Sequence, residues 1–128
     1  MPAPSVRSAI RSRSVYEPPD PADGLRVLAT RYWPRGVPRA AADEYARALS
    51  PSEELLRSFK ERRLDWWGFR KGYLEEMQSP EAQADVRRLA QLAATRPLTV
   101  MCVCKDEARC HRSLLRELVS DRATRSSP

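Results

Sequence analysis

The pattern of apolar and polar positions places extended segments near both ends of the chain. Residues 6–16 alternate weakly between apolar and polar side chains, and residues 25–33 are rich in β-branched and aromatic residues, so both are predicted to be strands. Residues 98–104, LTVMCVC, form an almost unbroken apolar run, as expected for a strand covered on both faces. These segments predict a sheet of at least three strands.

The middle of the chain has helical signals. The alanine-rich segment 39–49, RAAADEYARAL, predicts a first helix, and Ser50 followed by proline and glutamate marks the start of a second. Asp65 and Ser79 are placed to cap two more helices, each followed by apolar residues at helical spacing. The sequence CHRSLLRELV, from Cys110, predicts the last helix.

The order of these elements indicates the fold class. Strand, strand, several helices, strand and helix predict a small α/β domain, in which helices cover a partly parallel sheet of three or more strands. We expect a single domain over residues 9–121, a flexible N-terminus at 1–8 and a flexible tail at 122–128.

Length and apolar runs limit the class of protein. A chain of 128 residues suffices for one domain with one modest core. The run from Leu98 to Cys104 is far too short to cross a membrane, and the N-terminus lacks the apolar core of a signal peptide. We therefore expect a cytoplasmic protein without a membrane partner.

The chain is basic, with a formal net charge of +6. Such a charge suits a polyanion, but the basic residues are scattered and never run longer than two. A nucleic-acid partner is therefore only weakly supported, and nothing in the sequence predicts the oligomeric state.

One segment, CVCKDEARCHRSLL at 102–115, holds all three cysteines and the only histidine. A helix N-terminus stabilises anions and thiolates, which makes Cys110 a candidate reactive thiol and His111 a candidate acid or base. Arg112 opposes the helix dipole, so it needs a nearby carboxylate or an anionic ligand. Cys102 and Cys104 are interpreted as buried strand packing.

Neither a metal nor a cofactor is expected. The spacing of the cysteines and the histidine matches no common zinc motif, and alternate strand residues would need a bend for their sulfurs to converge on one ion.

A second candidate segment is TRYWPRG at 30–36, where Arg31 and Arg35 flank Trp33 after a predicted strand. Arginine beside an aromatic ring suits a planar anion, although a buried Trp33 with two solvated arginines is the simpler alternative. If strands 25–33 and 98–104 are parallel neighbours, this segment shares one cleft with the start of the last helix.

These motifs resemble the YeaO-like family, part of the domain of unknown function 488. The resemblance runs over residues 9–119 through VYEPPDPADGLRVLATRYWPRG, SPSEELLRSF, WxxFxxxYxxEM and LTVMCVCKDEARCHRSLL. It implies a cytosolic bacterial α/β domain but no reaction. It also implies that WPRG is a hallmark and that His111 is a more common element than the thiol, because members often have Asn-His where this chain has Cys-His-Arg. Asp43-Glu44-Tyr45 departs from the Asp-x-Trp of the family.

Three hypotheses about function remain open. The leading one is a cleft for an anionic small molecule, a nucleotide or a phosphorylated metabolite, with Arg31, Trp33, Arg35 and Arg112 binding it and His111 and Cys110 as candidate catalytic residues. The second is a non-enzymatic module that binds nucleic acid or protein. The third is a thiol-dependent redox or sulfur-transfer enzyme. The sequence does not decide whether the protein is an enzyme.

Overall fold

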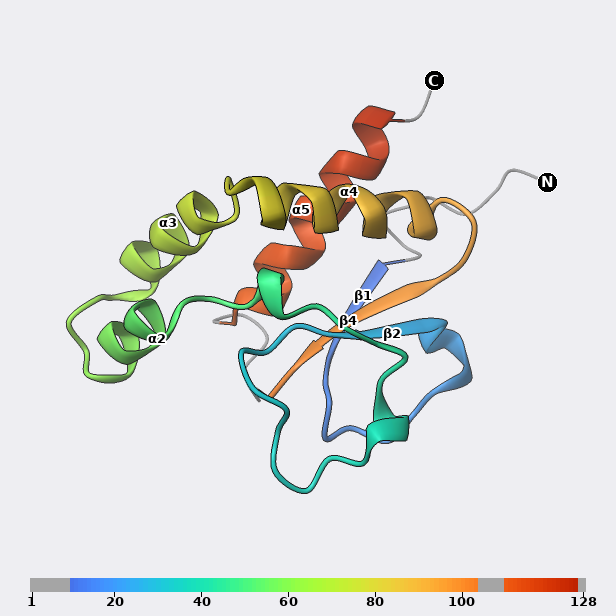
Figure 1. The fold of residues 1–128 in the computed structure, drawn as a ribbon, viewed down its shortest axis with the longest axis horizontal. Coiled ribbons are helices and arrows are strands. Elements are labelled where there is room, and N and C mark those ends of the chain that lie inside the picture. Colours follow the sequence, from blue (N-terminus) through green and yellow to red (C-terminus); the bar gives the residue numbers. More distant parts are fainter. Residues whose placement is uncertain (1–9, 104–109, 127–128) are drawn as a thin grey trace.

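The computed structural model describes residues 10–103 and 110–126, with side chains described as far as Ala123. Within these residues four parallel strands form one sheet in the order β1-β4-β2-β3 (Figure 1). The strands are β1 (Ile10–Ser14), β2 (Leu25–Leu28), β3 (Glu44–Tyr45) and β4 (Leu98–Cys102). The small α/β fold predicted from the sequence is confirmed, and the described strands are all parallel.

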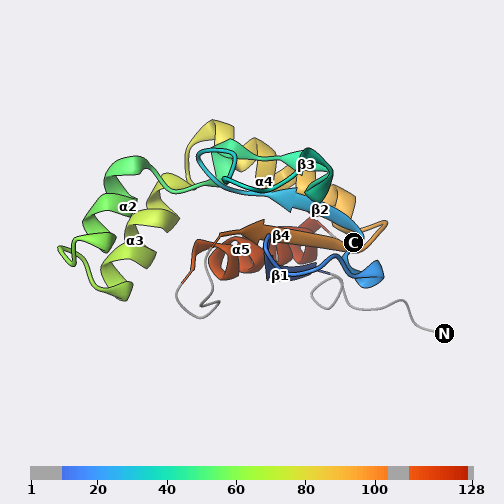
Figure 2. The same ribbon diagram turned by 90° about the horizontal axis from the view of Figure 1, so that it is seen from below.

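Four helices accompany the sheet: α2 (Glu53–Lys60), α3 (Trp66–Glu76), α4 (Pro80–Ala93) and α5 (His111–Ser126). The side chains of Asp65 and Ser79 cap α3 and α4 as predicted, whereas α2 is capped by Ser52, two residues after the expected Ser50. α4 and α5 lie side by side on one face of the sheet, and α2 and α3 project beyond the carboxyl ends of the strands (Figures 1 and 2).

The prediction of a helix over residues 39–49 is wrong. This segment contains two short 3-10 turns with strand β3 between them. The amide of Asp43 donates to the carbonyl of Arg26, and the amide of Ala46 donates to that of Leu28. The open edge of β2 thus takes up backbone groups that an isolated alanine-rich segment would pair within a helix.

Several boundaries also differ from the sequence-based expectation. Strand β2 ends at Leu28 rather than residue 33, and β4 ends at Cys102. The last helix continues to Ser126, past the domain boundary expected at 121. Cys104, where this strand was expected to end, and residues 105–109, which were expected to form a loop, lie outside the described residues.

The core has two parts because alternate strand residues point to opposite faces of the sheet. On the helix-covered face Val27, Val100 and Leu98 pack against residues of α4 and α5, including Leu89 and Leu115. On the other face a smaller cluster joins Val15, Leu28 and Met101, with Trp33 and Val37 packed against it from the connecting loops. Trp33 is therefore held by packing after β2 rather than standing free.

The turn into β2 depends on Gly24, whose φ of +62° is one that side chains with a Cβ rarely adopt. A Cβ there would overlap the backbone carbonyl of Pro97. This close approach lets the amide of Leu25 donate to the same carbonyl at 2.9 Å, which starts the pairing of β2 with β4.

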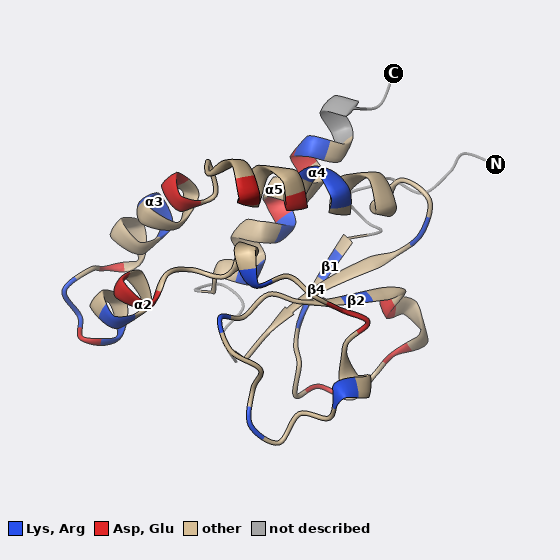
Figure 3. Cartoon of the chain, viewed as in Figure 1, with Lys and Arg blue, Asp and Glu red and all other residues tan. Residues whose placement is uncertain are grey.

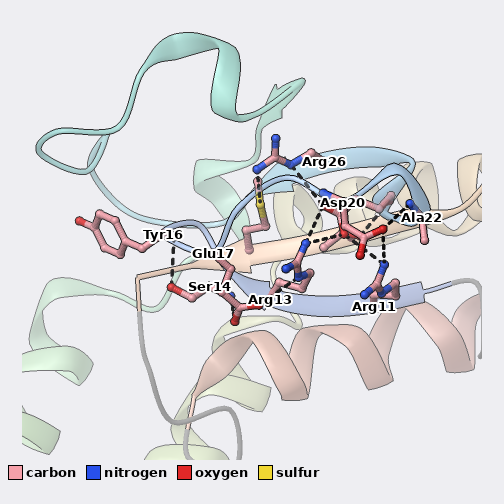
Figure 4. A network of polar contacts seen from close by, with 11 residues as sticks. Arg11, Arg13, Ser14, Tyr16, Glu17, Asp20, Ala22 and Arg26 are labelled. Carbon is pink, nitrogen blue, oxygen red and sulfur yellow. Dashed lines mark hydrogen bonds and ion pairs between the residues drawn. The ribbon is translucent and has the colours of Figure 1, made fainter.

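A buried carboxylate joins β1, β2 and the turn between them. Asp23 has a side chain that is only 2% exposed, and both of its oxygens accept from Arg13 Nη1, at 2.9 and 3.0 Å. Arg11 and Arg26 approach the same carboxylate at 3.3 and 3.7 Å (Figure 4). Three guanidinium groups thus surround one acid, on the face of the sheet that no long helix covers.

No described helix is long and apolar enough to span a membrane. Lysine and arginine are distributed over helices, strands and loops and are interleaved with acidic segments (Figure 3). The basic net charge therefore has no matching basic stripe along one described element.

Candidate functional site

Strands β2 and β4 are parallel neighbours, with Val27 opposite Val100 and Leu28 opposite Met101. This is the arrangement that the shared-cleft hypothesis requires. Their carboxyl ends bring the segment after β2, which begins with Ala29, to the same edge of the sheet as the start of α5. In open α/β sheets this edge is the usual place for ligand sites.

Two cysteines meet at this edge although eight positions separate them. The Sγ atoms of Cys102 and Cys110 lie 2.7 Å apart, and both side chains are buried. Arg112, which is 2% exposed, donates from Nη1 to the Cys102 sulfur at 3.4 Å. We call Cys102, Cys110, His111 and Arg112 the sulfur cluster.

The geometry around His111 defines its tautomer. Nε2 lies 2.6 Å from the carbonyl oxygen of Ala29, and because a carbonyl only accepts, Nε2 carries the hydrogen. Burial lowers the pKa of His111, and the Arg112 cation lowers it further, while Cys102 and the Ala29 hydrogen bond act in the opposite direction. The ring is therefore neutral, and its unprotonated Nδ1 lies 3.8 Å from the Cys110 sulfur.

Tyr73 of α3 supports the cluster from the helical layer. Its ring centroid lies 5.6 Å from that of His111, and its hydroxyl donates to the carbonyl of Leu49 at 2.8 Å. Burial raises the pKa of Tyr73 well above its ordinary value, and the two cysteines of the cluster contribute in the same direction. The phenol thus stays protonated and keeps its donor role.

A cavity of about 340 Å³ adjoins the cluster, and we call it the β2–α5 cavity. His111 and Val103, which directly follow the two clustered cysteines, form part of its wall. The other lining residues come from the segments around residues 16, 30–34 and 51–60: Tyr16, Thr30, Arg31, Tyr32, Trp33, Pro34, Pro51, Leu56 and Lys60. Trp33 and Pro34 of the WPRG segment and His111 at the start of α5 therefore line one cavity.

The ligand-binding residues expected from the sequence divide into two groups. Arg31 and Trp33 line the β2–α5 cavity, and Arg31 Nε is held by the carbonyl of Pro51 at 3.2 Å. Arg35 is exposed and is not among the lining residues, while Arg112 lies buried in the sulfur cluster. The positive charge next to the cavity therefore comes from Arg31 together with Lys60 of α2, which sequence reasoning did not select.

Cys102 is the other residue whose place in the site the sequence did not reveal. An apolar strand position gives no sign of which distant side chain it will meet, so Cys102 was interpreted as packing. In the structure it is buried, as expected of packing, but its sulfur also contacts Cys110 and Arg112.

Cys102, Cys110 and His111 also place their ligand atoms within 4.8 Å of one another, although no metal was expected. Two thiolates on one tetrahedral zinc lie about 3.8 Å apart, because Zn–S distances are near 2.3 Å. The sulfurs here are closer than that, at 2.7 Å, and a buried guanidinium already contacts one of them. The arrangement suits chemistry between the sulfurs better than it suits a cation.

Replacing His111 with glutamine is expected to flatten the dependence of stability on pH. The folded pKa of His111 lies below its ordinary value of 6.5, so as the pH falls below about 6.5 the unfolded chain binds a proton that the folded chain does not. The wild type should then lose up to ~1.4 kcal/mol per pH unit. Urea unfolding at several values between about pH 7 and pH 5, where histidine is the ordinary titrating side chain, measures this loss.

His111 is the only histidine of the chain, so the comparison isolates one group. Glutamine keeps an N–H that can donate to the carbonyl of Ala29. Equal slopes for the wild type and the His111→Gln variant would contradict a buried neutral imidazole.

Comparisons with known proteins extend over almost the whole domain. The family model described as the active DUF488-N3 subclade matches residues 10–123. The uncharacterized protein YeaO of Escherichia coli (strain K12) is 35% identical over 108 residues, which are 83% of this chain and 92% of YeaO. The uncharacterized protein Rv3073c of Mycobacterium tuberculosis (strain ATCC 25618 / H37Rv) is 30% identical over 115 residues, 88% of this chain and 95% of the relative. No solved structure gives a significant match.

The matched span contains every described strand, the WPRG segment and the sulfur cluster. It agrees with the resemblance carried by the sequence motifs. The chain therefore belongs to the DUF488 family, as a YeaO-like protein matched by the model of its N3 subclade.

Proposed function

We propose that the β2–α5 cavity binds a planar anionic small molecule, a nucleotide or a phosphorylated metabolite. The observation that carries this proposal is the chemical character of the wall. Arg31 and Lys60 supply positive charge, three aromatic side chains supply flat apolar surface, and among the described residues no aspartate or glutamate lines the cavity. Ligand sites of this size are commonly apolar with a few convergent polar groups.

The cations are arranged to receive a charged group. Arg31 is anchored through Nε to the carbonyl of Pro51, so its guanidinium is positioned before any ligand arrives. Lys60, the last residue of α2, is exposed and long enough to adjust to a phosphate at the mouth of the cavity.

The aromatic residues give the ligand a flat surface. Tyr32 and Tyr16 are 61% and 57% exposed, which is high for large aromatic side chains beside a cavity. Trp33 is fixed more firmly, since its indole Nε1 donates to the carbonyl of Val37 at 2.7 Å. A nucleobase or similar ring would gain about 1–3 kcal/mol from stacking on such a side chain.

The matched family model is described as the active DUF488-N3 subclade, and a site that holds an imidazole and two thiols agrees with that description. His111 adds a neutral imidazole at the cavity wall, and its Nδ1 lies 3.8 Å from the Cys110 sulfur. We place the reacting end of the ligand beside His111 and its charged end toward Lys60.

Titration calorimetry with AMP, adenosine and inorganic phosphate tests the proposal. AMP is expected to bind more tightly than either of its parts, because it combines a plane with a charge. The Lys60→Ala and Tyr32→Ala variants should each weaken AMP binding by about tenfold, which corresponds to ~1.4 kcal/mol and lies at the lower end for a charged hydrogen bond or a stacked base.

Lys71→Ala is the matched control, since Lys71 is an exposed lysine on α3 that does not line the cavity. It should leave AMP binding unchanged. Equal losses in the Lys60 and Lys71 variants would contradict a cavity site. Salt-dependent binding of a polynucleotide, lowered equally by both changes, would favour the nucleic-acid module instead.

A further inference from the structure

The sulfur cluster supports an activity that is independent of what the β2–α5 cavity binds. We propose that Cys102 and Cys110 form a reversible redox pair, which is oxidised by a hydroperoxide to an intramolecular disulfide. Their sulfurs are already in contact at 2.7 Å, and a disulfide needs only a closer approach to about 2.05 Å. The pair connects the end of β4 to the start of α5.

Each sulfur has a neighbour that favours loss of its proton. The Arg112 guanidinium donates to Cys102 Sγ at 3.4 Å and stabilises a thiolate there. The neutral His111 presents its unprotonated Nδ1 to Cys110 Sγ at 3.8 Å and can accept the thiol proton. An arginine in the first turn of α5, unfavourable for the helix dipole, thus has a function in the buried cluster.

The size of the oxidant follows from burial. Both cysteines are at most 1% exposed, which excludes direct attack by a bulky disulfide on this conformation. Val103 and His111, the residues directly after each cysteine, line the β2–α5 cavity, so a molecule as small as hydrogen peroxide in the cavity lies next to residues that adjoin the sulfurs.

The reaction balances with hydrogen peroxide as the oxidant. The Cys102 thiolate attacks one peroxide oxygen and the O–O bond breaks. Hydroxide is the leaving group, it takes up the proton released from the thiol, and Cys102 becomes a sulfenic acid. The Cys110 sulfur then attacks the Cys102 sulfur, the S–O bond breaks, and the oxygen leaves as water with the Cys110 proton. Two thiols and one peroxide thus give one disulfide and two waters, and a dithiol reductant reverses the change.

Mass spectrometry of the full chain tests the pair directly. The reduced protein is treated with one equivalent of hydrogen peroxide in a metal-free buffer and then alkylated in denaturant. Before alkylation we expect the intact mass to be lower by two hydrogens, and dithiothreitol added at this point to restore the original mass. Alkylation of the oxidised chain should then label one of its three cysteines.

Peptide mapping must separate Cys102 from Cys104, because trypsin leaves both on the peptide that ends at Lys105. The Cys104→Ser variant solves this and should still form the disulfide, linked to the Cys110-His111-Arg112 peptide. The Cys102→Ser and Cys110→Ser variants should not form this bond.

Arg112 is tested by rate as well as by product. The Arg112→Gln variant should oxidise about tenfold more slowly at neutral pH, because it removes the cation that contacts the Cys102 sulfur, and its rate should rise at higher pH than that of the wild type. Arg112→Lys should recover part of the rate. Thermal melting confirms that each variant is folded before its rate is compared.

Three results would overturn the proposal. The first is a wild type that keeps three free thiols, or forms only sulfinic acid, while peroxide is consumed. The second is a disulfide that disappears in Cys104→Ser. The third is stoichiometric zinc binding that protects Cys102 and Cys110 from peroxide, which would make the cluster a metal site.

Discussion

The Asp23→Ala variant is expected to lose about 3–5 kcal/mol of unfolding free energy, the usual cost of removing one partner from a buried ion pair. In the described network, Asp23 is the one buried acid that pairs with Arg11, Arg13 and Arg26. The side chains of Arg13 and Arg26 are themselves only 16% and 12% exposed. Without Asp23, the described acidic partners left to these cations are exposed carboxylates, Glu17 beside Arg13 and Asp20 beside Arg11. Urea unfolding followed by circular dichroism measures the loss.

The control is Glu17→Ala. Glu17 also pairs with Arg13, at 3.0 Å, but its side chain is 46% exposed, so its pair is screened by water and contributes only about 0–1 kcal/mol. If the two variants were equally stable, burial would not be what gives Asp23 its importance. A double-mutant cycle with Arg13 then separates the pair from the rest of the network.

The Tyr73→Ala variant is expected to lose a similar amount, about 3–5 kcal/mol, because it removes a fully buried aromatic side chain from between α3 and α5. Tyr73 stacks near Phe69, with ring centroids 6.4 Å apart, and its hydroxyl satisfies the carbonyl of Leu49. Urea unfolding measures the change. The Tyr73→Phe variant should lose only about 1–3 kcal/mol, since it leaves the buried carbonyl unpaired but keeps the packing.

Trp67→Ala is the control for Tyr73. Trp67 lies on the same helix and is larger, yet it is 69% exposed, so its loss should change stability by no more than about 0.5 kcal/mol. A large loss from Trp67→Ala, or none from Tyr73→Ala, would contradict the packing described for α3. Because Tyr73 also contacts His111, Tyr73→Ala should loosen the sulfur cluster as well.

The fold follows the sequence where the signal is local. The apolar run before Cys102 requires a covered strand, and caps such as Asp65 and Ser79 satisfy the free amides at the start of their own helices. These interactions involve neighbours in the chain, so they can be inferred without knowing the remaining structure. The α/β class, the central strand β4 and the helices α3 and α4 were predicted for this reason.

Strand β3 could not be predicted in the same way. Glu44 and Tyr45 lie in an alanine-rich segment whose local preference is helical, and only the free edge of β2 changes their conformation. A strand of two residues has almost no periodicity of its own. The conformation of this segment is set by its partner strand β2, which is distant from it in sequence.

The candidate site, like the fold, has features that the sequence predicted and features that it did not. The sequence predicted that the WPRG segment would lie beside the start of α5 if the strands before them were parallel neighbours, because the carboxyl ends of such strands meet at one edge of the sheet. Strands β2 and β4 are parallel neighbours. Sequence alone therefore determined which two segments to compare. It also predicted a helix from Cys110, and α5 begins one residue later, at His111. The sequence could not determine where each side chain points.

The direction in which each side chain points depends on how the sheet and the helices pack together. The registers of β4 and α5 bring Cys102 against Cys110, and burial of the same helix face turns Arg112 away from the cavity toward a sulfur. Arg35, in contrast, lies in a turn and faces solvent, and Lys60 of α2 lines the cavity although the sequence did not point to it. A side chain's partner depends on the free energy of packing the whole domain, which is why only the tertiary structure revealed the sulfur pair and the charge beside it.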